Sequence, residues 1–411
     1  MYKTQIHQLR NLSKNEFKLL KTLCWHSARL YNYGLYLTRQ QWFQTKTFLR
    51  YTENYFQCKD NENYRSMPAM MAQQTLKVVD RGMRSFLGLL KLAKEEGYSN
   101  PIRMPNYLDK DGYFTIWIPN HERGGFQIKS GKIHLTIGKQ LKEETGMKNL
   151  MLNLPPNINK DTIKEIRIHP KQNAHYFVME VVYEVKEKKR TKKKGVLGID
   201  IGLNNLATCW DMKNSRAFII SGRKIKSINH YWNKQNAELQ AKKTEKHYTK
   251  RQFLNTRKRN RRVRDFMHKA ARNIVNYCLI NGIGKIVVGH NDGWKQTFKK
   301  GKVNNQNFIQ VPFGLLMECL RYKCQEVGLQ YQEICESHTS KCSFLDGEPI
   351  RHHDDYVGKR NYRGLFKTAK GVKINADVNG AANIARKVTG DRSLSGDQVR
   401  GFVANPVFVS I

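Results

Sequence analysis

Three acidic residues stand where the surrounding apolar pattern leaves little room for charge. Asp200 lies within the apolar run 196–203, which predicts a buried strand. Glu336 closes a second predicted strand, and Asp377 falls in the first turn of a helix predicted over 375–387. An ionised carboxylate is costly to bury unless it is paired or binds a metal, so all three are candidate ligands. For Asp200, an exposed turn between two short strands is the alternative.

Carboxylates that converge from separate elements are what a two-metal phosphodiester site needs. Two Mg²⁺ ions about 3.5–4 Å apart activate a water molecule and stabilise the leaving oxygen. Carboxylate and water oxygens are the ligands that Mg²⁺ prefers. The three residues therefore indicate a magnesium-dependent hydrolase, on the condition that folding brings them to one point.

The composition indicates a polyanionic partner. The 411 residues include 73 Lys and Arg against 34 Asp and Glu, a formal charge of +39, and 39% hydrophobic residues suffice for packed cores. Nucleic acid is the default partner for such an excess. The chain has no run of about 18 apolar residues and no apolar N-terminal segment, so we expect a prokaryotic cytoplasmic protein without membrane contact. Eight scattered cysteines without a CxxC pair indicate reduced thiols.

Two basic segments are candidate phosphate contacts. The run 186–194, which contains Lys192 and Lys193, predicts a solvated linker that follows a phosphate backbone and marks a domain boundary. A helix predicted over 257–282 begins with a cluster whose charges repel one another unless an anion is close. The members of this cluster are Arg257, Lys258, Arg259, Arg261, Arg262 and Arg264.

Periodicity divides the N-terminal half into helices and then strands. Apolar residues recur at helical spacing over 15–50 and 68–96, and the period changes to two from about 97 to 183, as in a β-barrel or sandwich. Aromatic and basic residues interleave in the first stretch, where they form either a helical core or a base-stacking face for nucleic acid. They are Tyr31, Tyr33, Tyr36, Arg39, Trp42, Phe43, Arg50, Tyr51 and Tyr55.

Four segments resemble the transposon-encoded TnpB (OrfB) RNA-guided nucleases, which are relatives of compact type V CRISPR effectors. These segments are GIDIGLNNLATC, IVVGHNDGWKQ, TSKCSFLDG and INADVNGAANIARK. The resemblance implies an α/β multidomain protein with a C-terminal RNase H-like (RuvC) domain and a β-barrel wedge domain interrupted by a helical recognition lobe. The implied boundaries are 1–12 and 97–190 for the wedge, 13–96 for the lobe, 191–337 and 374–390 for the RuvC-like domain, 338–373 for a degenerate zinc-ribbon-like insertion that binds target nucleic acid, and 391–411 for a tail.

The resemblance implies an enzyme, an RNA-guided DNA endonuclease. Such a protein binds a guide RNA, recognises a short motif beside the target in double-stranded DNA and reads the rest by base pairing. The family's first and last catalytic aspartates fall on Asp200 and Asp377. With Glu336 they would hold the two Mg²⁺ ions.

The usual middle glutamate of the family is missing. Its position is Gly289, which has no side chain to bind a metal. We predict that Glu336 replaces it from the end of a neighbouring strand. Asp292, in a loop, and Glu333, at an odd offset that places it on the opposite strand face, are weaker candidates.

Zinc is not expected in the insertion, although the family usually carries paired CxxC motifs there. Cys335, His338, Cys342 and His352 have poor spacing for a tetrahedral site, and His353 adds no better set. Two other functions stay open. One is a nuclease-inactive, RNA-guided DNA-binding repressor, because of Gly289, and the other is a guide-free nucleic-acid-binding protein.

Overall fold

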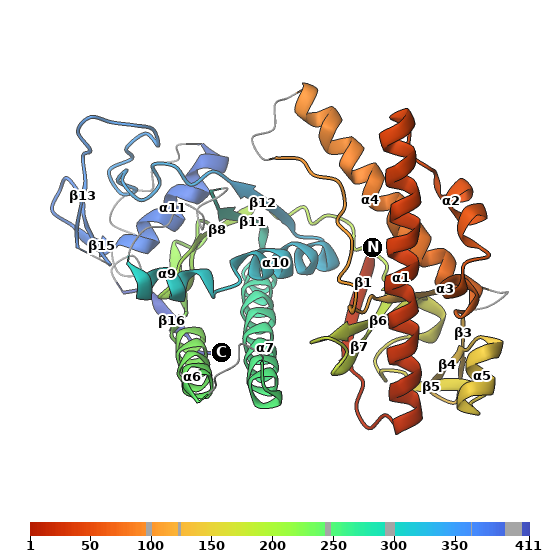
Figure 1. The fold of residues 1–411 in the computed structure, drawn as a ribbon. Helices are drawn as coiled ribbons and strands as arrows, with labels where there is room; N and C mark the ends of the chain where they lie inside the picture. Colours follow the sequence, from red (N-terminus) through yellow and green to blue (C-terminus); the bar gives the residue numbers. More distant parts are fainter. Residues whose placement is uncertain (96–100, 122–124, 243–247, 292–300, 363, 391–404) are drawn as a thin grey trace. The chain divides into compact units, whose positions relative to one another are not determined.

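The chain forms two units that are each built around their own sheets (Figure 1). The computed structural model describes residues 1–95, 101–121, 125–242, 248–291, 301–362, 364–390 and 405–411. The units are Met1–Val185 and Lys186–Ile411. The basic run 186–194 has no helix or strand and begins the second unit.

The N-terminal unit contains two open antiparallel sheets. The larger has the strand order β1-β7-β6-β2 and the smaller β3-β4-β5. Within the described residues these sheets share no ladder, so the strands form no closed barrel, contrary to the expected β-barrel. The strands are β1 (Tyr2–Gln8), β2 (Ile116–Pro119), β3 (Phe126–Lys129), β4 (Lys132–Thr136), β5 (Asn149–Asn153), β6 (Ile163–Lys171) and β7 (Tyr176–Glu184), and a short helix, α5 (Lys139–Thr145), joins β4 to β5.

A block of helices is inserted between β1 and β2. The first begins at a capping box, in which the Ser13 hydroxyl accepts from the Glu16 amide and the Glu16 carboxylate accepts from the Ser13 amide. Its apolar face packs with the next long helix and with the inner faces of both sheets in one core. The helices are α1 (Lys14–Thr45), α2 (Tyr51–Cys58), α3 (Glu62–Arg65) and α4 (Ala69–Glu95).

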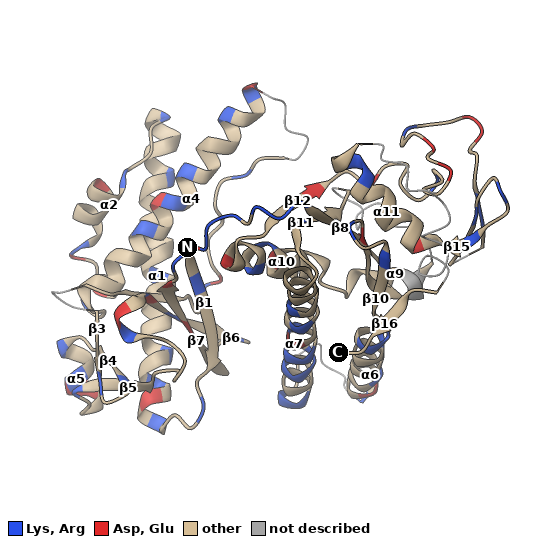
Figure 2. Ribbon diagram, turned by 180° about the vertical axis from the view of Figure 1, so that it is seen from behind, with Lys and Arg blue, Asp and Glu red and all other residues tan. Residues whose placement is uncertain are grey.

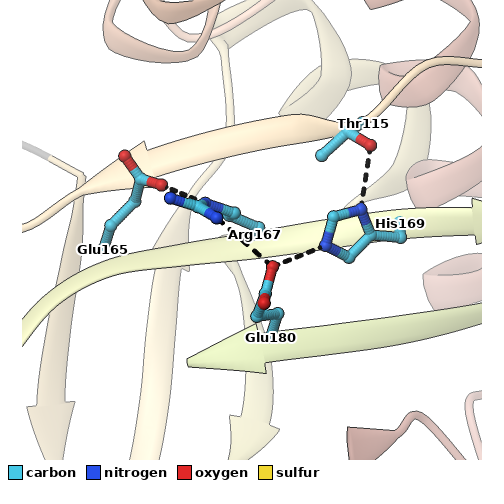
Figure 3. A network of polar contacts seen from close by, with 5 residues as sticks. All are labelled: Thr115, Glu165, Arg167, His169 and Glu180. Atoms are coloured by element: carbon cyan, nitrogen blue, oxygen red, sulfur yellow. Dashed lines mark hydrogen bonds and ion pairs between the residues drawn. The ribbon is translucent and has the colours of Figure 1, made fainter. Parts of the chain in front are cut away.

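The half-buried face of β6 and β7 carries a chain of polar side chains (Figure 3). The His169 ring contacts the Glu180 carboxylate at 3.0 Å through Nε2 and the Thr115 hydroxyl at 3.0 Å through Nδ1. Arg167 pairs with both Glu180 and Glu165. Because strand residues alternate between faces, this network lies opposite the apolar residues that enter the core, such as Ile166 and Ile168.

The C-terminal unit is built on a six-stranded mixed sheet of order β12-β11-β8-β9-β10-β16. Strand β11 runs parallel to both β8 and β12, so the carboxyl ends of these three strands meet at one edge of the sheet. Strand β9 is antiparallel to β8. The strands are β8 (Gly195–Ile201), β9 (Asn205–Asp211), β10 (Arg216–Ser221), β11 (Ile283–Gly289), β12 (Gln330–Ile334) and β16 (Val407–Val409).

Helices cover both faces of this sheet. Leu197 and Ile199 of β8 enter a core with α7 and α10, whereas Val196 enters a second core with α11. Strand β8 lies close to α11, since a Cβ atom on Gly198 would be 2.2 Å from the Ala381 carbonyl oxygen. The helices are α6 (Arg223–Ala241), α7 (Lys250–Ile280), α9 (Lys302–Ile309), α10 (Phe313–Val327) and α11 (Ala376–Thr389).

The segment between β12 and α11 contributes a small antiparallel sheet to the C-terminal unit. Its strands are β13 (Lys359–Tyr362), β14 (Leu365–Lys367) and β15 (Lys373–Asn375). All eight cysteines lie within the described residues, and each is a free thiol. In the part of the chain that the structure describes, no helix has the length and apolar character needed to cross a bilayer.

Candidate active site at the carboxyl edge of the central sheet

Asp200 is the penultimate residue of β8, a strand position and not a turn. Its carboxylate points at α11, because a Cβ atom on Gly380 would lie 2.7 Å from Asp200 Oδ2. Burial raises the pKa of Asp200 well above its usual range, and the nearby charges of Asp377 and Glu336 raise it further, against the opposing charge of Arg360. Asp377 and Glu336 are therefore both within electrostatic reach of Asp200.

Asp377 stands in the first turn of α11, as the sequence predicts. The Asn375 side chain caps this helix by accepting hydrogen bonds from the amides of Asp377 and Val378. The Asp377 carboxylate is held from both sides, since Asn205 Nδ2 donates to Oδ2 at 2.7 Å and Arg360 pairs with Oδ1 at 3.2 Å. Three elements, α11, β9 and β13, thus meet at this carboxylate.

Glu336 follows β12 at the same edge of the sheet. Its backbone amide donates to Asn291 Oδ1 at 3.1 Å, and its side-chain Oε1 accepts from Asn291 Nδ2 at 3.2 Å. Burial raises the pKa of Glu336, while the charges of His290 and Lys387 oppose this rise. Asn291, two residues beyond β11, thereby fixes the end of the neighbouring β12.

The geometry explains why position 289 is glycine. Gly289 pairs with Ile334 in the parallel ladder, and a Cβ atom on Gly289 would lie 3.2 Å from Glu336 Cβ and 2.4 Å from Ile384 Cδ1. The Glu336 side chain and α11 therefore occupy the space that a side chain at 289 would need. Glu333 instead pairs with Arg321, and Asp292 lies outside the described residues.

The donor set fits a hard divalent cation. Clustered carboxylates whose charges raise the pKa of Asp200 are oxygen ligands of the type that Mg²⁺ takes. Among the described residues, however, no three His, Cys, Asp or Glu side chains already stand together as a ligand set. Arg360 and Asn205 contact the two oxygens of Asp377 instead. A cation here would compete with Arg360 for that carboxylate.

The insertion between β12 and α11 is held together by polar side chains. Glu348 is 2% exposed, and its two carboxylate oxygens accept from the amides of Ser343 at 2.6 Å and Val357 at 2.9 Å. Asp346 accepts from the Ser343 hydroxyl at 2.6 Å and from the Ala369 amide at 2.8 Å. Two carboxylates therefore join three separate loop segments.

The residues considered for zinc have other partners. The buried Cys342 thiol donates to the Arg351 carbonyl at 3.5 Å, and the Cys335 thiol contacts Ser337 Oγ at 2.9 Å. The rings of His338 and His352 lie edge to face at 5.9 Å, and His338 Nδ1 contacts a tyrosine hydroxyl. This arrangement does not fit a tetrahedral zinc site.

The basic cluster of α7 divides into an outer and an inner part. Arg257, Lys258, Arg261 and Arg262 line one pocket on the helix surface, and Arg264 is exposed. Figure 2 shows the resulting run of Lys and Arg along α7. Both Lys192 and Lys193 are exposed, and Lys193 Nζ donates to the Leu279 carbonyl.

Arg259 differs from the rest of the cluster. Its guanidinium donates to Asn229 Oδ1 and to the Gln310 carbonyl, each at 2.8 Å, and lies 5.4 Å from the centre of the Trp232 ring. Burial lowers its pKa. Helical spacing turns Arg259 toward α6, so this side chain joins elements of the protein.

Three side chains of the site were not among the sequence candidates. Asn205 lies inside the GIDIGLNNLATC segment, so that motif carried a signal for it. Asn291 follows the strand that ends at Gly289, again within a motif. Arg360 had no signal, because it lies in a polar and basic stretch with no apolar pattern to single it out.

The structure is that of an α/β multidomain protein with acidic residues at one edge of its central sheet. Comparison with known proteins relates it to two families. Residues 180–295 match the family described as a probable transposase, OrfB of IS605, and residues 313–384 match the Cas12f1-like TNB domain. The TnpB-like protein ORF457 of Acidianus two-tailed virus is 25% identical over 414 residues, covering 90% of this chain and 83% of that one. The chain is thus related to the TnpB family and to type V effectors, as its motifs indicated.

Solved structures agree at the level of the fold. The structure of a Cas12f1–sgRNA–target DNA complex matches with a TM-score of 0.58 at 17% identity, covering 91% of this chain and 83% of that chain. The mini-RNA-guided endonuclease CRISPR-Cas_phi3 matches with a TM-score of 0.51 at 12% identity, covering 96% and 93%. The mixed α/β multidomain fold is therefore similar to that of these effectors.

Proposed function

We propose that this protein is an RNA-guided DNA endonuclease that hydrolyses phosphodiester bonds in target DNA with Mg²⁺. The observation that carries the proposal is the gathering of Asp200, Glu336 and Asp377 at one edge of the central sheet, close enough for two of them to raise the pKa of the third. The relationship to TnpB, and the similarity to an effector solved with guide RNA and target DNA, support guide RNA and double-stranded DNA as partners.

In this proposal, the C-terminal unit is the RuvC-like nuclease domain and the N-terminal unit supplies the wedge domain and helical recognition lobe. Asp200, Glu336 and Asp377 would hold the metal ions, which activate water and neutralise the scissile phosphate when bound. Asn205 and Asn291 orient two of the carboxylates through the hydrogen bonds described above. Arg360 neutralises charge beside Asp377.

The basic side chains of α7 that line its surface pocket, together with Lys192, would contact nucleic-acid phosphates. The residues that line this pocket include four cations and one carboxylate, that of Asp265. Phosphate contacts of this kind position nucleic acid without reading its sequence. Base pairing with the guide would supply the sequence specificity.

The test is cleavage of a plasmid that matches the guide and carries the adjacent motif. Asp200→Ala, Asp377→Ala and Glu336→Gln should each abolish cleavage, because each removes a metal-binding carboxylate. Glu333→Gln is the matched control, since Glu333 lies on β12, three residues before Glu336, but pairs with Arg321. Normal cleavage by Glu336→Gln would show that this residue does not replace the missing glutamate.

A nuclease-inactive, RNA-guided DNA-binding protein is the second candidate, favoured by the glycine at position 289. That function predicts guide-dependent binding of the plasmid by the unmodified protein with no cleavage at any Mg²⁺ concentration. A guide-free binding protein predicts that no discrete RNA species accompanies the purified chain. Sequencing of the co-purified RNA separates this last function from the other two.

A further inference from the structure

One face of α1 carries a stripe of polar and aromatic residues that stay out of the core. Its members alternate in spacing between four and three, which places them above one another on the helix. The stripe spans about 27 Å at 1.5 Å per residue. It consists of Trp25, Arg29, Asn32, Tyr36, Arg39 and Phe43.

An extended segment is bound along this stripe. Asn32 donates to the Leu108 carbonyl at 3.0 Å and accepts from the Leu108 amide at 2.8 Å. Arg39 donates to the Pro105 carbonyl at 3.3 Å. These hydrogen bonds fix the chain on both sides of Tyr107, whose ring lies 4.8 Å from the Arg39 guanidinium. Tyr107 is therefore held beside α1 by its neighbours' main-chain contacts.

Three aromatic rings on or beside the stripe are open to solvent. Tyr36 is 49% exposed, Phe43 52% and Tyr107 44%, and the Phe43 ring lies 5.8 Å from the Arg39 guanidinium. By contrast, Tyr31 is 8% exposed and belongs to the core between α1 and α4. The interleaved aromatics of this stretch thus serve two purposes, since some build the core and others stay outside it.

The Arg39 guanidinium lies beside aromatic rings and a main-chain carbonyl. Among the described residues no carboxylate pairs with Arg39, and its buried Nε has no hydrogen-bond partner. Exposed rings beside such a cation match the chemistry of an unpaired nucleotide, because the rings stack on the base and the guanidinium attracts the phosphate. In a duplex the base faces are already stacked on one another, so they are not available to stack on these rings.

We propose that Phe43 and Tyr107, which lie beside Arg39, and Tyr36, three residues before Arg39 on the same face of α1, form a stacking surface for unpaired nucleotides. The proposal rests on the proposed function and deepens it, because it gives the N-terminal unit a contact with a single-stranded stretch of guide RNA or of target DNA. Both sources share the chemistry of an exposed base beside a phosphate.

The test compares binding of unpaired and duplex probes by the full chain, freed of co-purified RNA. The triple variant Tyr36→Ala, Phe43→Ala, Tyr107→Ala should bind fluorescent oligo(dT) and oligo(U) at least about 10-fold more weakly, since stacking on even one ring contributes about that much. Binding of a duplex DNA probe should stay unchanged. Replacing the rings by other rings (Tyr36→Phe, Phe43→Tyr, Tyr107→Phe) should retain binding.

Phe56→Ala is the matched control. Phe56 is 59% exposed on α2 and lies 5.5 Å from the Lys59 amine, so it too is an exposed ring beside a cation, but outside the surface. Arg39→Gln should weaken binding and lower the salt dependence by about one released ion, whereas the triple variant should leave that dependence unchanged. For each variant we divide the affinity for the single strand by the affinity for the duplex. The proposal would be overturned if this ratio were the same for the triple variant as for Phe56→Ala.

Crosslinking then locates the contact. Oligo(U) or oligo(dT) carrying a 5-iodinated pyrimidine should crosslink to peptides that contain Tyr36, Phe43 or Tyr107. Crosslinks from oligo(U) alone would assign the surface to RNA, and crosslinks from oligo(dT) alone would assign it to DNA. Crosslinks confined to other peptides would refute the surface. These measurements use the Asp200→Ala variant and read binding, not cleavage. A negative result here therefore contradicts the stacking surface and not the proposed nuclease activity.

Discussion

Gly289 and Glu336 share one small volume at the carboxyl edge of the sheet. A side chain at 289 would run into Ile384 Cδ1 at 2.4 Å and into Glu336 Cβ at 3.2 Å. The two positions therefore constrain each other, and a carboxylate can come from one of them at a time. The exchange of these positions can be tested directly.

Moving the carboxylate back to position 289 should restore cleavage to a variant that lacks Glu336. Glu336→Ala alone should be inactive. Adding Gly289→Glu together with Ile384→Ala should recover measurable plasmid cleavage, because alanine removes both Ile384 atoms that a Cβ at 289 would meet, Cδ1 at 2.4 Å and Cγ1 at 2.9 Å, at a cost of about 2–5 kcal/mol. The same triple variant with Gln at 289 is the control and should stay inactive. Without Ile384→Ala, Gly289→Glu should lower the melting temperature through overpacking.

The three acidic residues could be selected as candidates from the sequence, because a carboxylate in an apolar run, at a strand end or at a helix N-terminus is a local signal. Their partners could not. Arg360 reaches Asp377 from β13, on another element, and Asn291 reaches Glu336 across 45 positions. The inner position of Arg259 also depends on a tertiary contact, with Asn229 of α6.

At the scale of elements, the β6–β7 pair depends on the network around Glu180. Its hydrogen bond to His169, helped by the charge of Arg167, lowers the pKa of Glu180 from 4.5 to about 2, against the effect of burial. Because the folded-state pKa lies below the unfolded one, the stabilisation is complete above about pH 4.5 and is lost as the pH falls toward about 2. Its full size is at most about 3 kcal/mol.

Glu180→Gln should therefore lower the free energy of unfolding near neutral pH, and the difference from the unmodified protein should shrink as the pH falls below about 4.5. Urea unfolding across this range measures the difference. Glu143→Gln, an exposed carboxylate on α5, is the control and should show little difference at any pH. If Glu180→Gln lowered the free energy of unfolding by the same amount at every pH, the stabilisation would not come from the lowered pKa of Glu180.

The insertion before α11 should depend on Glu348. Glutamine would leave one acceptor oxygen and place an NH₂ group against a backbone amide, which costs about 1–3 kcal/mol for a buried group. Glu348→Gln should speed amide hydrogen exchange across 338–373, whereas Asp354→Asn, an exposed neighbour, should not. A zinc chelator should leave exchange unchanged in the unmodified protein. Faster exchange after chelation would mean that zinc holds this segment.

Periodicity predicts which segments are helices or strands better than it predicts which strands pair with one another. The apolar spacing predicted helices at 15–50 and 68–96, where α1 ends at Thr45 and α4 covers Ala69–Glu95. The expected barrel is two open sheets, because ladder partners such as Tyr2 and Glu184 are chosen by contacts across the whole unit. The parallel pairing of β16 with β10 likewise joins segments that no local pattern connects.

At the scale of the whole molecule, the formal charge of +39 predicts that the proposed binding of nucleic acid depends strongly on salt. The outer part of the α7 cluster should contribute measurably to this dependence. Replacing Arg257, Lys258, Arg261 and Arg262 by Gln should flatten the plot of log affinity against log salt by up to about four ions and weaken binding uniformly across sequences.

Arg259→Gln provides the contrast on the same helix. Its guanidinium is bonded to Asn229 and Gln310, so its loss should lower the melting temperature of the protein and leave the salt slope nearly unchanged. Binding titrations of a duplex probe over a range of salt, with melting curves of each variant, separate the two effects. A slope change from Arg259→Gln as large as that from any outer residue would mean that Arg259 leaves its internal contacts to bind phosphate. The division of this helix into a nucleic-acid face and a packing face would then be wrong.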